Sequence, residues 1–467
     1  MAEIIAQSPN TAAAKPAGPL SVRNFRLLWS GEGISLLGDQ FALIALPWLV
    51  LQLTGDALAL GAVMALAGIP RALFMLIGGA FVDRFSPRVV MFASNLARML
   101  LVAALSVLVL TGEVRFWMLY VFALSFGLAD AFYFPGQSAI VPQILETDQL
   151  QAGNALVQGT AQLSLFLGPV LAGGLIALFG NSHHVAGENT PGANGIGAAF
   201  AIDALSFLAS LWALWRMRIC KPHTAAEHQS SVLTSIKEGL TYVWDSAVLR
   251  MLFVVMMAVN FLVIGPFEVG IPVMADTRLS EGAAAYGIIM SAFGGGALIG
   301  IILAGVLPRP KPARFGAVLL ILTAYLGLGL ILLPLSSSIA IVALIGLSIG
   351  VTNGYVNISL ITWLQKHIPD VLMGRIMSLM MFAGLGVAPI SAMLAGALLH
   401  VNLDALFIGA GLLMAAVALA TITMPVVRQM GLEVPESNQT PPLADARRRT
   451  GDLPALRSTH EMPVVKP

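Results

Sequence analysis

The chain has 467 residues, of which 57% are hydrophobic and only 10% are charged, and its formal net charge is +1. Soluble domains usually carry about 25% charged residues, so this composition excludes a water-soluble protein and predicts an integral membrane protein. The near-zero net charge argues against a nucleic-acid partner. A single cysteine, Cys220, excludes an internal disulfide framework.

Twelve apolar runs are long enough to cross a bilayer as helices, since a crossing needs roughly 20 apolar residues. These runs do not alternate polar and apolar residues, as the strands of a membrane barrel do. We therefore predict an all-α membrane protein with twelve transmembrane helices. The expected spans are 30–54, 57–81, 88–111, 116–141, 152–180, 196–218, 250–275, 283–307, 315–335, 338–363, 372–400 and 403–427.

The longest internal break divides these spans into two groups of six. We expect an N-terminal six-helix half over 21–218, a linker with an amphipathic helix over 219–249, and a C-terminal six-helix half over 250–427. Residues 1–20, which lack the pattern of a signal peptide, and the Pro- and charge-rich residues 428–467 are expected to be disordered tails. Arg447 to Arg449 in the second tail could contact anionic membrane lipid.

Lysine and arginine residues predict the orientation of the chain. With the N-terminus in the cytoplasm, nearly all of them fall in cytoplasmic segments, and only Arg115 and Arg278 lie on the other side. Since cytoplasmic loops carry an excess of these residues, we expect both termini to be cytoplasmic.

The loop between spans 2 and 3, GGAFVDRFSPR, concentrates charge in a short break. It resembles the signature loop of the major facilitator superfamily, although Ser86 and Pro87 depart from the usual pattern. A glycine lets helices approach closely, and an acid beside arginines can form a latch that gates the cytoplasmic face. Alternatively, the arginines only set the topology. The matching residues are Gly79, Asp83, Arg84 and Arg88.

Span 5 carries a second resemblance, to the Gly-Pro motif of proton-coupled exporters in the same superfamily. A close-packing face would explain the same residues, so the preference for export is implied by the resemblance alone. The motif residues are Gly168, Pro169, Gly173 and Gly174.

The stretches 23–55 and 130–156 are similar to the branch that contains macrolide-efflux, multidrug-efflux and enterobactin-exporter proteins. The resemblance covers residues 21–427. It implies two related halves that rock between two states, export in exchange for protons, and a bacterial inner membrane. Many drug exporters of this superfamily carry an arginine within span 4, which this chain lacks, so their proton relay cannot be copied here.

Ionisable residues inside spans are costly and therefore each needs a reason. Asp39 and Asp130 are our candidates for carrying the coupling proton, with Arg71 as the expected partner of either one. A buried carboxylate that alternates between an apolar site and an arginine would take up and release a proton. A fixed structural pair of Asp39 and Arg71 is the alternative. The ionisable residues within the spans are Glu32, Asp39, Arg71, Arg98, Asp130, Asp203 and Glu268, of which we expect Arg98 and Asp203 to be structural.

Spans 1, 4, 7 and 10 line the central cavity in the family that the chain resembles. Glu268 could attract a cationic substrate, Asn353 and Asn357 share a helix face, and aromatic side chains suit apolar ligands. Such aromatic residues are more often lipid-facing or packing residues, and Glu32 could serve the helix dipole. The candidate cavity residues are Glu32, Glu268, Asn353, Asn357, Phe134 and Phe261.

The sequence therefore predicts a monomeric transporter, not an enzyme, that exports apolar or amphipathic small molecules in exchange for protons. No metal site, cofactor or ATP-binding motif is expected; His183, His184 and Glu188 are expected to be polar surface. A siderophore or metabolite exporter, an importer, and a non-transporting receptor on the same scaffold remain alternatives, because fold alone does not fix function.

Overall fold

The structure, a computed structural model, describes residues 18–179, 193–218, 240–308, 310–368 and 370–429. In this part of the chain the secondary structure is helical, with no strand. Twelve helical segments are long and apolar enough to cross a membrane, which confirms the predicted all-α fold. The expected tails and linker lie mostly outside the described residues, and the predicted domain limits stay predictions.

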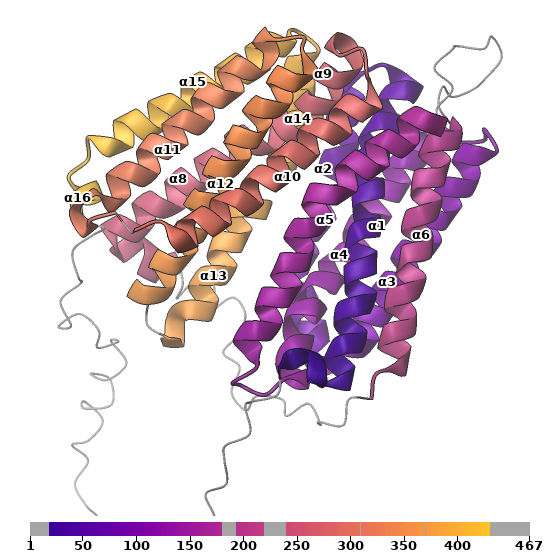
Figure 1. Ribbon diagram of the computed structural model, residues 1–467, viewed down its shortest axis with the longest axis horizontal. Helices are drawn as coiled ribbons and strands as arrows, with labels where there is room; N and C mark the ends of the chain where they lie inside the picture. Colours follow the sequence, from indigo (N-terminus) through magenta and orange to yellow (C-terminus); the bar gives the residue numbers. More distant parts are fainter. Residues whose placement is uncertain (1–17, 180–192, 219–239, 309, 369, 430–467) are drawn as a thin grey trace, which may run out of the picture.

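The N-terminal half contains six spans, drawn in indigo to magenta in Figure 1. The short η1 (Pro19–Ser21) precedes them. Gly55 ends the first span with φ at 61°, in the left-handed region that favours glycine, and the Asp56 side chain then caps the second by accepting from the Leu58 N–H at 2.8 Å. The spans are α1 (Arg23–Thr54), α2 (Ala57–Arg84), α3 (Pro87–Leu110), α4 (Phe116–Ile144), α5 (Leu150–Phe179) and α6 (Ala193–Arg216).

Two spans of the C-terminal half are interrupted. The seventh span consists of α8 (Ala247–Gly265), the π-helical turn η2 (Pro266–Gly270) and α9 (Ile271–Arg278), and the eleventh breaks between α13 (Asp370–Leu385) and α14 (Ala388–Leu399). Prolines just after each break explain them, since proline cannot donate the backbone hydrogen bond that continues a helix. The other elements are α10 (Ala283–Val306), α11 (Pro312–Leu332), η3 (Leu333–Leu335), α12 (Ile339–His367), α15 (Leu403–Ile422) and α16 (Val426–Gln429).

The expected span limits agree with the helices to within a few residues at most ends. The largest difference is at α1, which begins at Arg23 rather than at residue 30. A helix can extend beyond the hydrocarbon layer, so an apolar run marks the buried part of a helix and not its full length. Of the expected linker helix, residues 240–245 are helical, and Val243 is fully buried against the C-terminal half.

The two faces of the molecule are distinguished by charge. The side at which α1 begins at Arg23 and α2 ends at Arg84 is called the basic face. The side at which α1 ends at Thr54 is called the opposite face. Described basic residues at the basic face are Arg23, Arg26, Arg84, Arg88, Arg216, Arg218, Arg250, Lys311, Arg314 and Lys366.

The halves meet through small residues on two helix pairs, α5 with α10 and α2 with α14. A side chain on Gly173 of α5 would lie 2.5 Å from the carbonyl oxygen of Ala283, and one on Gly61 of α2 would lie 2.6 Å from that of Ala392. These contacts let the helix backbones touch, and neither position tolerates a larger residue without movement.

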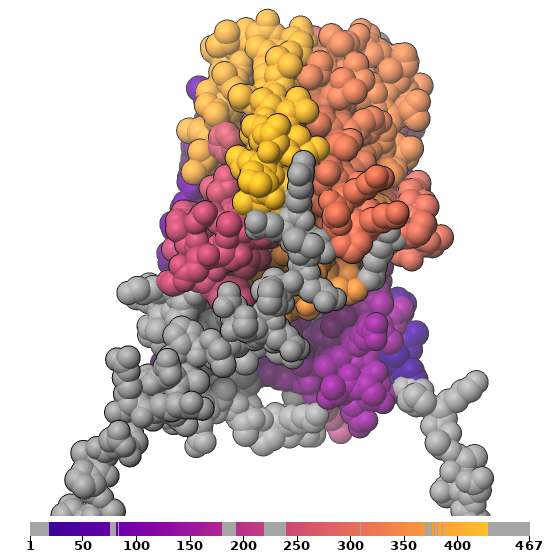
Figure 2. All heavy atoms as spheres, turned by 90° about the vertical axis from the view of Figure 1, so that its left-hand side faces the viewer, coloured from indigo at the N-terminus to yellow at the C-terminus, as the bar shows by residue number. Residues whose placement is uncertain are grey.

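These contacts belong to the part of the molecule near the opposite face. Polar contacts also join the halves there, because Gln52 donates to Asp276 at 3.2 Å and His400 lies 3.8 Å from Asp56. Towards the basic face the two halves diverge, with α13 and the start of α5 well apart (Figure 1). Seen from the C-terminal half, magenta atoms of the N-terminal half stay visible beneath it (Figure 2). The conformation is thus closed at the opposite face.

Candidate functional site

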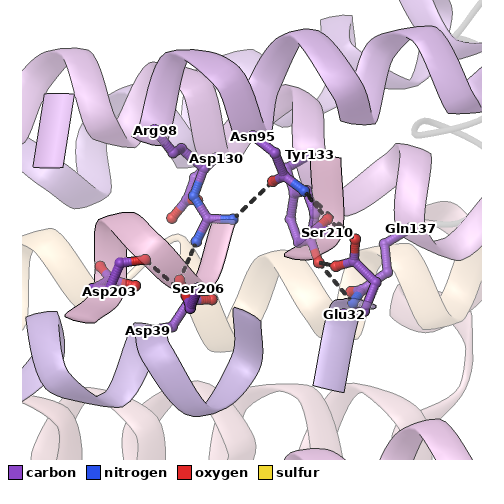
Figure 3. A network of polar contacts seen from close by, with 10 residues as sticks. All are labelled: Glu32, Asp39, Asn95, Arg98, Asp130, Tyr133, Gln137, Asp203, Ser206 and Ser210. Carbon is purple, nitrogen blue, oxygen red and sulfur yellow. Dashed lines mark hydrogen bonds and ion pairs between the residues drawn. The ribbon is translucent and has the colours of Figure 1, made fainter. Parts of the chain in front are cut away.

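A buried polar network lies inside the N-terminal half (Figure 3). It contains four carboxyl groups and one guanidinium, contributed by four helices. On each helix the polar residues follow spacings of three, four or seven, which place them on one stripe facing the bundle interior. The residues are Glu32 and Asp39 on α1, Asn95 and Arg98 on α3, Asp130, Tyr133 and Gln137 on α4, and Asp203, Ser206 and Ser210 on α6.

Arg98 is the centre of this network. Its Nη2 donates to Asp39 Oδ1 at 3.0 Å, its Nε lies 3.1 Å from Asp130 Oδ1, and its Nη1 donates to Asn95 at 3.3 Å. The side chain is 5% exposed. Arg98 therefore joins the two acids that we predicted to carry the coupling proton.

The expected pairing of Arg71 with Asp39 or Asp130 is wrong. Arg98, which we expected to be structural, pairs with both acids, because α3 places it at mid-helix against α1 and α4. The sequence signal was present: Arg98 lies near the centre of a 24-residue apolar helix, too deep for its guanidinium to reach the interface easily.

Aromatic rings surround the Arg98 guanidinium. Its Cζ lies 5.1 Å from the ring centre of Phe126, 4.8 Å from that of Tyr133 and 4.7 Å from that of Phe207. Rings at this distance attract a cation and keep water away from it. The ion pairs of Arg98 therefore lie in surroundings of low polarity, where charge interactions are strong.

Glu32 forms the second part of the network. Its carboxylate accepts from Ser210 at 2.5 Å, from Asn95 at 3.5 Å and, through a short hydrogen bond, from Tyr133. Gln137 in turn donates to the Tyr133 hydroxyl at 3.0 Å. Glu32 is 6% exposed and lines a small pocket between α1, α4 and α5, so the structure brings it to the acidic network. Its role as a substrate-contacting residue stays a prediction.

Glu268 and Arg71 lie where the halves approach each other. Glu268 is half-buried on the π-helical turn η2, which packs against α2, and Arg71 of α2 exerts an electrostatic attraction on it. No hydrogen bond between described residues engages the buried Nε of Arg71. Arg71 therefore attracts a carboxylate of the other half without forming an ion pair with it, and it lies outside the network around Arg98.

The remaining cavity candidates are spread over both halves. Asn353 is half-buried and Asn357 is exposed on α12, and the described residues offer neither of them a hydrogen bond. Phe261 on α8 is half-buried, and its carbonyl oxygen accepts from Ser391 at 2.5 Å. Phe134 packs edge-on against Tyr133, with ring centres 5.7 Å apart, beside the Glu32 cluster. Their contact with substrate stays a prediction.

The loop after α2 is anchored within its own half. Arg88 donates to the carbonyl oxygens of Leu214 at 2.6 Å and Trp215 at 2.8 Å, which fixes the start of α3 against the end of α6. Arg84 is exposed, and the side-chain surroundings of Gly79 and Asp83 lie outside the described residues. The gating role of this loop stays a prediction.

The motif of span 5 lies at the contact between the halves. Gly168 packs against Gln40 of α1. Gly287 of α10 packs against both Gly173 and the carbonyl oxygen of Pro169. The Val170 N–H, beside the proline, donates across the halves to Ser291 at 2.8 Å. Gly174 differs, because a side chain there would meet no atom within 4 Å. Three motif residues are therefore close-packed.

Metal ligands do not gather within the described part of the chain: no three His, Cys, Asp or Glu side chains are arranged to hold an ion. The expected surface residues His183, His184 and Glu188 lie outside it.

Comparisons with known proteins agree with the twelve-span helical fold and identify its family. Residues 28–390 match the sequence pattern of the Major Facilitator Superfamily. The chain is 28% identical over 429 residues to the multidrug efflux pump Tap of Mycolicibacterium fortuitum, covering 89% of this chain and 98% of that protein. It is 26% identical over 151 residues to macrolide efflux protein A of Streptococcus pyogenes, covering 32% of this chain and 36% of that protein.

The fold also matches solved transporter structures. A mutant of the nucleoside transporter NupG superposes with a TM-score of 0.67 at 11% identity, covering 87% of this chain and 99% of that one, which shows the shared fold. The resemblance drawn from the signature loop is confirmed. The chain belongs to the Major Facilitator Superfamily and is a multi-pass membrane transporter of small molecules, not an enzyme.

Proposed function

We propose that this protein exports apolar or amphipathic small molecules across the bacterial plasma membrane in exchange for protons. The halves rock between a state closed at the opposite face, as in this structure, and a state closed at the basic face. The basic face is cytoplasmic, in keeping with the excess of lysine and arginine there.

The observation that carries this proposal is the charge balance of the buried network. The network contains four carboxyl groups and one guanidinium, which pairs with two of them, so full ionisation would leave three negative charges uncompensated inside the N-terminal half. Burying an uncompensated charge costs several kcal/mol, so such a site is stable only when it holds protons. A fixed structural pair would need one acid for one arginine and not four.

Asp39 and Asp130 are the proposed coupling residues, and Arg98 takes the tuning role that we had assigned to Arg71. Both acids touch the same guanidinium, so protonation of one releases Arg98 to the other. Because α1, α3, α4 and α6 all belong to the N-terminal half, the proposal requires α1 or α4 to shift relative to α3 and α6 as the halves rock, which changes these distances. Proton binding and conformation are coupled in this way.

Substrate and direction rest on the relatives and on the chemistry of the C-terminal half. The matched proteins are named for multidrug and macrolide efflux. The side chains of α8 from Val255 to Ile264 are all half-buried, and they include Met256, Met257 and Phe261. Such adaptable apolar side chains suit varied ligands.

The test uses inverted membrane vesicles with an imposed proton gradient and two probes, the cationic dye ethidium and erythromycin. We expect gradient-driven uptake in vesicles with the protein, none in vesicles without it, and loss of uptake with an uncoupler. Asp39→Asn and Asp130→Asn should lose gradient-driven accumulation, whereas Asp245→Asn, a change at an acid outside the spans, should not.

Intact gradient-driven uptake in both Asp39→Asn and Asp130→Asn would refute the coupling assignment. Uptake by the parent protein that persists with the uncoupler would refute proton exchange itself. Failure with both probes, followed by uptake of siderophores or metabolites in a wider screen, would replace drug export with a narrower transport function.

A further inference from the structure

Among the described residues, Asp203 is the one acid of the buried network whose carboxyl group neither accepts a hydrogen bond nor forms an ion pair. The residue is 0% exposed, at mid-helix on α6. Neither of its carboxyl oxygens accepts a hydrogen bond from any described residue, and neither lies in an ion pair. The one hydroxyl next to it on the helix, that of Ser206, donates instead to the backbone oxygen of Asp203 at 2.7 Å.

The Asp203 carboxyl faces α1 beside the proposed coupling site. A side chain on Gly38 would lie 3.1 Å from Asp203 Oδ1, and Gly38 directly precedes Asp39. Arg98 attracts Asp203 as well as Asp39 and Asp130, but its donors already point at Asp39, Asn95 and Asp130. The Arg98 guanidinium thus attracts Asp203 electrostatically without contacting it.

A buried carboxylate with no donor and no contacting cation is unstable, whereas the neutral acid is tolerated. We infer that Asp203 is a second proton-binding site of the transporter, occupied in the conformation closed at the opposite face and emptied when Arg98 shifts towards it. The step moves only a proton, from the Asp203 carboxyl to water, and the guanidinium then compensates the carboxylate. This inference rests on the proposed proton exchange. It assigns a proton-binding role to a residue that we expected from the sequence to be structural.

Infrared spectroscopy of the full chain in lipid tests this directly, since a protonated carboxyl has a carbonyl stretch that an ionised carboxylate lacks. We expect one such band to be absent from Asp203→Asn and present in Asp245→Asn, which makes the same change at an exposed acid outside the spans. In the parent protein the band should fade reversibly as the pH is raised while the protein stays folded.

A band that is equal in the parent protein and in Asp203→Asn would overturn the inference, and so would a band that persists at every pH at which the protein is folded. If Asp203→Asn does not fold, aspartate labelled with ¹³C decides instead. A shifted band must then appear in Asp39→Asn and in Asp130→Asn, and its absence from both overturns the inference. The spectrum needs no substrate, so its outcome is independent of the vesicle assay that tests proton exchange.

Discussion

Arg98 Nη2 lies 3.0 Å from Asp39 Oδ1, and the same guanidinium lies 3.1 Å from Asp130. One cation thus links spans 1, 3 and 4 at a depth where water is scarce. When two carboxylates share a single guanidinium, a proton taken up by one acid changes the ion pair of the other. Such an arrangement suits proton exchange.

Loss of Arg98 should be more damaging than loss of any other described arginine. Arg98→Ala leaves the acids of the network without a cation, and breaking a buried pair in this way costs about 3–5 kcal/mol. We expect a clearly lowered thermal midpoint in detergent and no gradient-driven transport. Arg98→Lys should regain part of the stability but little transport, since lysine lacks the planar fork that serves two acids.

The control for this change is Arg115→Ala, at an exposed position before α4. It should leave both the thermal midpoint and transport unchanged. An Arg98→Ala protein with the stability of the parent would contradict the central position of the guanidinium.

The close contact between α5 and α10 should control which face is closed. In Gly287→Ala the new side chain would strike the Pro169 carbonyl oxygen and lie 3.0 Å from Gly173 Cα. Such overpacking costs about 1–3 kcal/mol and should favour the state open at the opposite face. Gly174→Ala, where no atom lies within 4 Å, is the matched control.

Thiol labelling measures this shift in a Cys220→Ser background, with Gln52→Cys as the reporter because Gln52 is half-buried at the opposite face, against Asp276 of the other half. We expect labelling from that face to be several-fold faster in Gly287→Ala than in Gly174→Ala. Equal labelling rates would mean that the small-residue contact does not hold the halves together.

Fixing the halves at the opposite face should arrest transport. Gln52 and Asp276 come from different halves and are joined by a 3.2 Å hydrogen bond. In the Cys220→Ser background, a short, cleavable thiol cross-linker between Gln52→Cys and Asp276→Cys should abolish ethidium transport until it is cleaved, because alternating access requires the halves to separate there.

The matched control joins Arg278→Cys to Asp404→Cys. These residues belong to the same half and form a 2.6 Å ion pair. Cross-linking them should leave transport largely unchanged. Transport that continues through a complete Gln52–Asp276 cross-link would exclude the rocking mechanism.

Glu268 should select for positive charge in the substrate. Glu268→Gln removes the half-buried carboxylate at the contact between halves, and a lost charge interaction of about 1–2 kcal/mol corresponds to a roughly tenfold change in affinity. We expect a higher KM for ethidium and an unchanged KM for a neutral dye such as Nile red. Glu281→Gln, at an exposed position, serves as the control. Equal effects on both dyes would assign Glu268 a structural role.

The sequence by itself determined the class of protein and most of its topology. An apolar run that must satisfy its backbone within the bilayer has no alternative to a helix, so composition and run length were sufficient for twelve spans. The signature loop with Arg84 and Arg88 and the Gly-Pro motif at Pro169 were sufficient for the family. Depth within the apolar runs selected seven ionisable residues, Asp39 and Asp130 among them, because charge inside a span is costly; the coupling role of these two acids stays a prediction.

Only the tertiary structure decided which charges meet. The partner of Asp39 and Asp130 is Arg98 and not Arg71, which attracts Glu268 of the other half without forming an ion pair with it. The position of a residue along its helix determines its depth in the membrane. The direction of its side chain around the helix axis determines its contacts only once the neighbouring helices are known. Which helices are neighbours depends on how all twelve pack together, and no single run of sequence contains that information.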